Sequence, residues 1–283
     1  MNNKYQLISI NKDYIDIDSF KIELTNRAFR YGDGFFETMH ANGLDVQFLK
    51  SHYKRIKNSA EILKLELPKY FNIDFLQKQI EGLLVRNKLF QGVRVRLYIY
   101  RNSDGLYIPD SKKCDILIEA SYLSDGYYRL NKKGLNIGVY DDMPKPITLY
   151  SSIKSINAQF YILAGVYAKE NNYDDVLLLN NDNYIVEATS SNVFIVKDNT
   201  IITPSLVSGC VNGIMRNQII DMANTLGYNV IFNNISLDSL NNADEVFLTN
   251  AVSGVRYVSG YKDKRFMKKT SSKLIDRLNT IFR

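Results

Sequence analysis

The stretch SSIKSINAQFYILAGVYAKENNYDDVLLLN, residues 151–180, with YIVEATSSNVFIV, residues 184–196, decides how the rest of the chain is interpreted. A helix-like segment follows Lys154, and β-rich runs follow the helix, with Glu187 at the end of the apolar run YIV. An amine among small and apolar neighbours can be desolvated, which makes it a nucleophile toward aldehydes. Glutamate is a poor strand residue, so Glu187 indicates either an exposed edge or a carboxylate with a chemical partner.

Outward from this stretch, helical and strand patterns alternate in two halves of the chain. Apolar spacing predicts helices over 51–65, 72–89, 153–172 and 210–227. Apolar or alternating runs predict strands, which include 5–10, 19–24, 35–41, 92–103, 114–123, 135–143, 174–180, 184–189 and 192–204. We therefore predict an α+β fold with two domains, 1–123 and 135–283, joined by the polar, turn-rich linker 124–134.

Composition excludes several classes of protein. The 283 residues are 45% hydrophobic and 23% charged, which is ordinary for a globular protein, and no apolar run is long enough for a membrane span. Two distant cysteines, Cys114 and Cys210, are typical of reduced thiols in the cytoplasm. The net charge of +6 is dispersed apart from KDKRFMKKTSSK at 262–273, so we favour a solvated basic surface over a nucleic-acid site. Two histidines without clustered acids argue against a catalytic metal.

Three segments suit a phosphate group. Arg55 lies on the expected helix 51–65, and the planar guanidinium of arginine gives two donors to one anion. The sequence GCVNGIMRN puts Asn-Gly before a helix, where the backbone N–H groups of Ile214 and Met215 can bind an anion. In LTNAVSG, small residues follow a strand, and amides near Ala251 can form a similar nest.

Six blocks in order resemble the class IV (fold type IV) pyridoxal-phosphate enzymes: NRAFRYGDGFFET, HYKRIKNSAEIL, IKSINAQFYILA, VEATSSNVFIV, CVNGIMR and FLTNAVSG. That family includes aminodeoxychorismate lyase and the branched-chain and D-amino-acid aminotransferases. The resemblance implies a D-amino-acid aminotransferase-like fold, a homodimer, and pyridoxal 5′-phosphate bound by Lys154 as the Schiff-base lysine and proton shuttle. It also implies that Glu187 meets the pyridine nitrogen, and that the phosphate lies among Arg55, Ile214, Met215 and Ala251.

The reaction within this family is less closely defined by the sequence. CVNGIMR and LTNA resemble the lyase branch, which would release pyruvate and leave 4-aminobenzoate, a step of folate biosynthesis. Transamination of branched-chain or D-amino acids with 2-oxoglutarate is the alternative, and a non-catalytic binding protein on the same scaffold is a third. Tyr31, Arg96 and Arg101 are the candidate substrate contacts, with the two arginines as receptors for a carboxylate. Position 159, five residues after the lysine, is Gln159, where some aminotransferases carry a tyrosine.

Overall fold

A computed structural model describes residues 6–123 and 126–281. The chain divides into two compact units, Met1–Gly126 with Ile153–Asn157, and Tyr127–Ser152 with Ala158–Arg283. This division differs from the expected one in two ways. Residues 127–134 of the expected linker belong to the second unit, and five residues around Lys154 belong to the first. Linker residues 124–125 lie outside the described residues.

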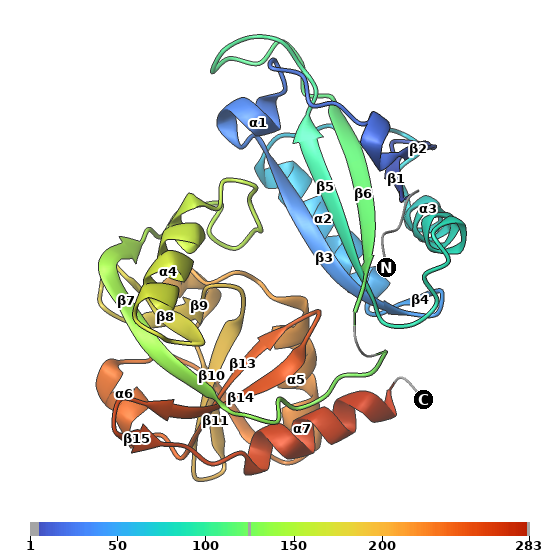
Figure 1. Cartoon of the computed structure of the whole chain (residues 1–283). Helices are drawn as coiled ribbons and strands as arrows, with labels where there is room; N and C mark the ends of the chain where they lie inside the picture. The colour runs from blue at the N-terminus through green and yellow to red at the C-terminus, as the bar shows by residue number, and fades with distance from the viewer. Residues whose placement is uncertain (1–5, 124–125, 282–283) are drawn as a thin grey trace. The chain divides into compact units, whose positions relative to one another are not determined.

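The first unit is built on an antiparallel sheet of six strands in the order β2-β1-β6-β5-β3-β4 (Figure 1). Alternate side chains of β3, such as Phe35 and Met39, are fully buried in the core beneath the helices. The strands are β1 (Leu7–Ile10), β2 (Asp13–Asp16), β3 (Gly34–Asn42), β4 (Asp45–Val46), β5 (Val93–Arg101) and β6 (Cys114–Tyr122). The helices are α1 (Arg27–Tyr31), α2 (Leu49–Ile62) and α3 (Ile73–Arg86), with a short 3-10 turn at Ile17–Ser19.

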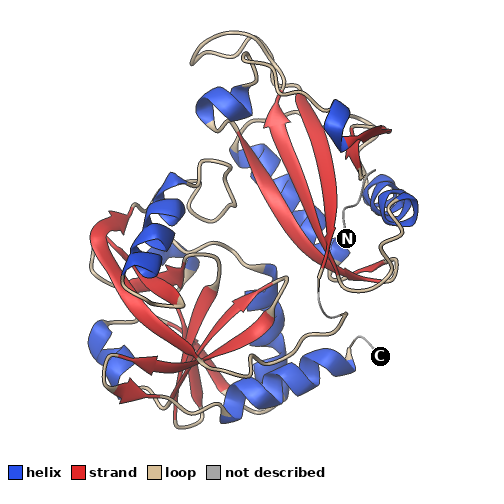
Figure 2. Cartoon of the chain, in the orientation of Figure 1, coloured by secondary structure: helices blue, strands red, loops and turns tan. Residues whose placement is uncertain are grey.

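The second unit contains a nine-stranded mixed sheet, with β12-β11-β10-β13-β14-β7-β8-β9 in order and β15 paired to β14. Figure 2 colours the strands of both units red and the helices blue. Helix α4 connects the parallel strands β7 and β8. The strands are β7 (Leu135–Lys145), β8 (Asp175–Asn180), β9 (Ile185–Ala188), β10 (Asn192–Lys197), β11 (Thr200–Thr203), β12 (Asn229–Phe232), β13 (Glu245–Asn250), β14 (Gly254–Tyr261) and β15 (Lys264–Arg265). The helices are α4 (Gln159–Glu170), α5 (Ile214–Thr225), α6 (Leu237–Asn242) and α7 (Lys269–Thr280), with a 3-10 turn at Leu206–Ser208.

Two local expectations are wrong. Residues 19–24 are described by the structure, and they do not form the expected strand. The partner of β1 is β2 instead, because the chain turns back directly after β1 through Asn11 (φ 55°). The helix expected over 153–172 begins only at Gln159. Residues 154–156 run beside β3 instead, because the Phe36 N–H donates to the Lys154 carbonyl (2.9 Å) and the Ile156 N–H donates to the Gly34 carbonyl (3.1 Å).

Glycine is required at position 34 for this pairing. A Cβ there would lie 2.5 Å from the Ile99 carbonyl oxygen on one side and 2.8 Å from the Ile156 side chain on the other. Both are closer than a Cβ contact allows, so a larger residue would push the Lys154 segment off β3. Among the described helices, none combines the length and apolar character needed to cross a membrane.

Candidate functional site

Lys154 is held against β3 by its backbone, and its side chain lies over an aromatic ring. The ammonium nitrogen is 4.7 Å from the centre of the Phe36 ring, a cation–π distance. Because side chains alternate along a strand, Phe36 faces away from the core that Phe35 and Glu37 enter. The Lys154 amine thus lies near the face of the sheet opposite this core.

On the helix side of the same strand, Glu37 organises Arg55. One carboxylate oxygen of Glu37 accepts from Arg55 Nε (2.7 Å), and the other accepts from Arg55 Nη2 (2.6 Å) and lies 2.7 Å from His52 Nδ1. Burial raises the pKa of Glu37, but the charge and hydrogen bonds of Arg55, with His52, outweigh it and lower this pKa to about 2. The predicted phosphate ligand Arg55 is therefore oriented by a carboxylate that stays ionised.

His52 completes this buried group as a neutral ring. Burial lowers its pKa, although Glu37 works in the opposite direction. A neutral imidazole beside a carboxylate donates through Nδ1, so Nδ1–H points at Glu37. No hydrogen-bond partner for His52 Nε2 lies among residues 6–123 and 126–281.

In the second unit, Glu187 on β9 is 3% exposed and accepts three hydrogen bonds. Its Oε1 accepts from the Tyr161 hydroxyl (2.7 Å) and from the Lys145 ammonium, and its Oε2 accepts from the Val211 N–H (2.8 Å). Burial, followed by the Glu187 charge, raises the pKa of Tyr161, which keeps its hydroxyl a donor. The carboxylate expected to meet a ring nitrogen is thus held from β7, α4 and the segment before α5.

The predicted phosphate amides also belong to this unit. Helix α5 begins at Ile214, and its N-cap Gly213 makes no side-chain capping hydrogen bond, so the first-turn N–H groups keep the character of an anion site. A Cβ at Gly213 would lie 1.9 Å from Asn192 Oδ1, which explains the glycine. The turn that carries Ala251 is fixed by the Tyr128 hydroxyl, which donates to the Ala251 carbonyl (2.9 Å).

The three candidate substrate residues have different surroundings in the first unit. Arg96 on β5 is 34% exposed, and its guanidinium lies 5.3 Å from the Phe36 ring centre and 5.2 Å from that of Tyr98. Arg101 is buried, and it donates to Asp33 (2.9 Å) and to backbone carbonyls at the end of α2. Tyr31 ends α1, with its ring 5.5 Å from that of the exposed Tyr107. Arg96 therefore shares Phe36 with Lys154, whereas Arg101 is engaged within the fold.

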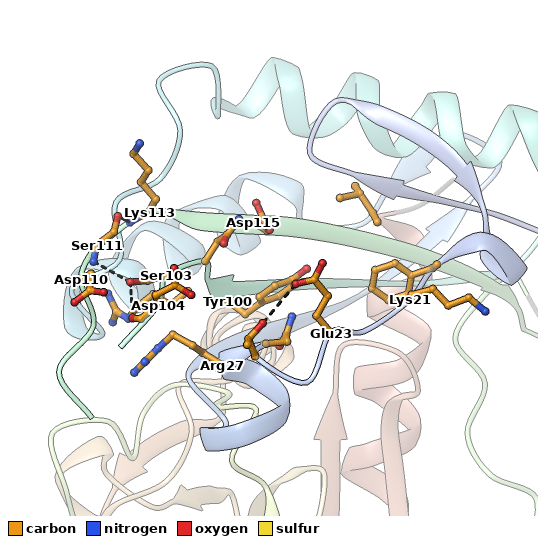
Figure 3. Close-up of a pocket in the computed structure, with 16 residues that line it drawn as sticks. Lys21, Glu23, Arg27, Tyr100, Ser103, Asp104, Asp110, Ser111, Lys113 and Asp115 are labelled. Atoms are coloured by element: carbon orange, nitrogen blue, oxygen red, sulfur yellow. Dashed lines mark hydrogen bonds between the residues drawn. The ribbon is translucent and has the colours of Figure 1, made fainter. Parts of the chain in front are cut away.

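A separate polar pocket of about 710 Å³ opens in the first unit (Figure 3). Its lining mixes acids such as Glu23, Asp110 and Asp115 with Arg27 and Tyr100. The side chains around Lys154 and Glu37 do not line it. In the part of the chain that the structure describes, His, Cys, Asp and Glu side chains form no group of three or more placed to hold a metal ion.

Sequence reasoning missed Lys145, Tyr161 and the Glu37–His52 pair. The segment DDMPKP around Lys145 is polar and carries no local signal of burial. Tyr161 lies two residues beyond the position at which some aminotransferases carry a tyrosine. Glu37 was detectable in principle, because it occupies a core position in the alternating strand pattern of FFETMHA and so needs a cationic partner.

The sequence of this chain matches one protein family and is similar to proteins of known name. The family described as amino-transferase class IV matches residues 34–261. Aminodeoxychorismate lyase of Vibrio harveyi is 25% identical over 241 residues, covering 84% of this chain and 87% of that protein. A probable branched-chain-amino-acid aminotransferase of Rickettsia felis is 30% identical over 252 residues, covering 88% and 84%.

Among solved structures, the T.th. branched-chain amino acid aminotransferase complexed with N-(5′-phosphopyridoxyl)-L-glutamate superposes with a TM-score of 0.86. It is 27% identical, and the match covers 98% of this chain and 93% of that one. This likeness confirms the α+β, two-domain fold type IV architecture expected from the sequence.

Proposed function

Because the chain belongs to the amino-transferase class IV family of pyridoxal-phosphate-dependent enzymes, we propose that it acts at the amine of a carboxylate-bearing substrate. The preferred reaction is aminodeoxychorismate lyase-like elimination, in which pyruvate leaves and 4-aminobenzoate remains. A proton leaves the carbon that bears the amine, the neighbouring carbon–oxygen bond breaks, and the enolpyruvate released takes up a proton. The ring gains aromaticity, which drives the elimination forward.

The residues of this chain fit the cofactor. Bound pyridoxal phosphate supplies an electron-withdrawing ring that stabilises charge at the substrate carbon. Each unit carries donors that would suit a phosphate group: the guanidinium of Arg55 in the first unit, and the uncapped first turn of α5 in the second. Glu187 would hold a proton on the ring nitrogen, because its Oε2 accepts one hydrogen bond, from the Val211 N–H, and has room for a second. Lys154 Nζ would accept the proton from the carbon that bears the amine, and it would donate a proton to the released enolpyruvate.

One observation carries the preference for elimination: the Arg96 guanidinium lies at cation–π distance from both the Phe36 and the Tyr98 rings. A guanidinium beside aromatic rings suits a planar substrate that carries a carboxylate, because arginine gives two parallel donors to that group. Lys154 lies over the same Phe36 ring. A cyclic amino carboxylate would fit this arrangement better than a short aliphatic side chain.

Transamination of branched-chain or D-amino acids with 2-oxoglutarate is the second candidate. It is favoured by the 30% identity with the Rickettsia felis aminotransferase, which exceeds the 25% identity with the Vibrio harveyi lyase. The first steps at Lys154 are common to both reactions. The Arg96 carboxylate site would then receive 2-oxoglutarate.

The deciding assay gives the purified protein aminodeoxychorismate alone, and separately each amino acid with 2-oxoglutarate. Pyruvate and 4-aminobenzoate in equal amounts without an acceptor would support the lyase. Acceptor-dependent 2-oxo acid formation, with no 4-aminobenzoate, would replace it by the transaminase. Arg96→Gln should raise KM with little loss of kcat, whereas Arg94→Gln, an exposed arginine two residues along the same strand face, should change neither.

We further propose that the enzyme is a cytoplasmic homodimer. The outer side of α4 exposes Ile162 (62%), Leu163 (43%) and Val166 (47%), an apolar stripe that favours contact with a second copy. Tyr31 and Arg101 stay predictions as substrate contacts. Of the three candidates, Arg96 has the surroundings best suited to that role.

A further inference from the structure

A second lysine, Lys145, is buried against the carboxylate assigned to the ring nitrogen. We propose that Lys145 is a positioning residue that orients Glu187, so that Oε2 alone is presented to the cofactor ring N–H. This inference rests on the proposed role of Glu187. Lys145 acts through Glu187 and touches neither substrate nor reacting atoms in this scheme.

An irregularity at the end of β7 places Lys145 beside Glu187. The residues before it, 141–144, are exposed, and Lys145 itself is buried. The β7–β8 pairing changes register between Tyr140 and Lys145, which re-aims the end of the strand. Without this irregularity, the strand alternation would not place Lys145 beside Glu187.

Hydrogen bonds fix the position of the Lys145 ammonium group. Its ammonium donates to Glu187 Oε1, to the Gly209 carbonyl (2.5 Å) and, at 3.5 Å, to the Ser151 carbonyl. An ammonium has three N–H donors, so all three are accounted for. Its charge compensates a carboxylate that is 3% exposed, where an unpaired charge would be strongly destabilising.

The hydrogen bonds that Glu187 already accepts indicate which of its two oxygens can meet the ring nitrogen. A carboxylate offers about two acceptor positions on each oxygen. Oε1 uses both, for Lys145 and for the Tyr161 hydroxyl at 2.7 Å. Oε2 uses one, for the Val211 N–H at 2.8 Å. The remaining position on Oε2 is the one that can accept from the ring nitrogen.

The test compares Lys145→Met and Lys145→Arg with wild type in the binding of pyridoxal phosphate to the apoprotein. Lys145→Met should raise the dissociation constant by about tenfold, because the carboxylate loses its fixed orientation. It should also shift the pH midpoint of the bound cofactor's absorbance change, which a loss of stability alone would not do. Lys145→Arg, which keeps the charge, should recover most of the affinity. Lys169→Met, an exposed lysine on α4, is the matched control.

A double variant protects the test against misfolding of Lys145→Met. Lys145→Met with Glu187→Gln removes both buried charges, and it should bind the cofactor and titrate like Glu187→Gln alone. A difference of more than about threefold between those two would mean that Lys145 acts independently, and it would overturn the proposal. Wild-type affinity and an unchanged midpoint in Lys145→Met would also overturn it. If wild-type protein itself does not bind the cofactor, the proposed function fails instead.

Discussion

Replacing Glu37 by glutamine should weaken the fold in a way that depends on pH. The variant keeps the size of the side chain but removes the charge that pairs with Arg55 and His52. Two buried polar groups then lose their ionic partner, and truncating one member of such a group is costly. The same change releases the orientation of Arg55, so affinity for pyridoxal phosphate should fall as well.

The magnitude follows from the pKa of Glu37, which the fold lowers from 4.5 to about 2. At 1.36 kcal/mol per pKa unit, this corresponds to about 3 kcal/mol of stability. Because the folded-state pKa is depressed, the contribution is complete above the unfolded value of 4.5. It is lost as the pH falls toward 2, and about 2 kcal/mol should remain at about pH 3.5.

Urea unfolding followed by circular dichroism at about pH 7, 5 and 3.5 measures the difference between wild type and Glu37→Gln. Glu61→Gln, an exposed carboxylate on α2, is the matched control and should change the unfolding free energy by less than about 0.5 kcal/mol. The reasoning is refuted if the difference in unfolding free energy between wild type and Glu37→Gln is the same at every pH. It is also refuted if Glu37→Gln is as stable as wild type at neutral pH.

Three further predictions concern other parts of the chain. Burial raises the pKa of the Cys114 thiol to about 12 and that of the Cys210 thiol to about 11. Neither cysteine should therefore react with a thiol reagent at about pH 8 until urea unfolds the protein, and labelling of the native protein would contradict this. Tyr128→Phe removes the hydrogen bond to the Ala251 carbonyl, and it should lower the free energy of unfolding by about 1 kcal/mol in thermal or urea unfolding. Cofactor binding should weaken as well. Unchanged stability would show that this bond does not hold the turn. Ile162→Asp should convert the proposed dimer into monomers in sedimentation experiments, and a wild-type protein that sediments as a monomer would exclude that interface.

Strongly periodic segments were predictable from the sequence. The helix expected at 72–89 is α3, and the strands expected at 92–103 and 114–123 are β5 and β6. Their patterns reflect burial on one face, which local sequence encodes directly. The start of α4 was not predictable in this way. The conformation around Lys154 depends on hydrogen bonds to β3, which is distant in the sequence.

The sequence named candidate site residues, and the contacts that the structure gives them were not predictable from it. The motif blocks pointed to Lys154 and Glu187, because the chemistry needs an amine and a carboxylate in those contexts. Nothing near Lys145 indicated that it would pair with Glu187, since the irregular end of β7 is a property of the sheet. The Arg55 guanidinium was expected as a phosphate ligand, but its orientation by Glu37 comes from a helix–strand contact.

The five residues Ile153–Asn157 have a consequence for recombination. The chain leaves the C-terminal unit, adds a short edge to β3, and returns to begin α4. A chimera that exchanges only residues 1–126 for those of a relative would pair a foreign β3 with the native Lys154 segment. The edge around Gly34, where there is no space for a Cβ, and the segment at 153–157 must therefore be inherited together. The useful breakpoints enclose both pieces, so the units are not modules that can be exchanged with a single cut.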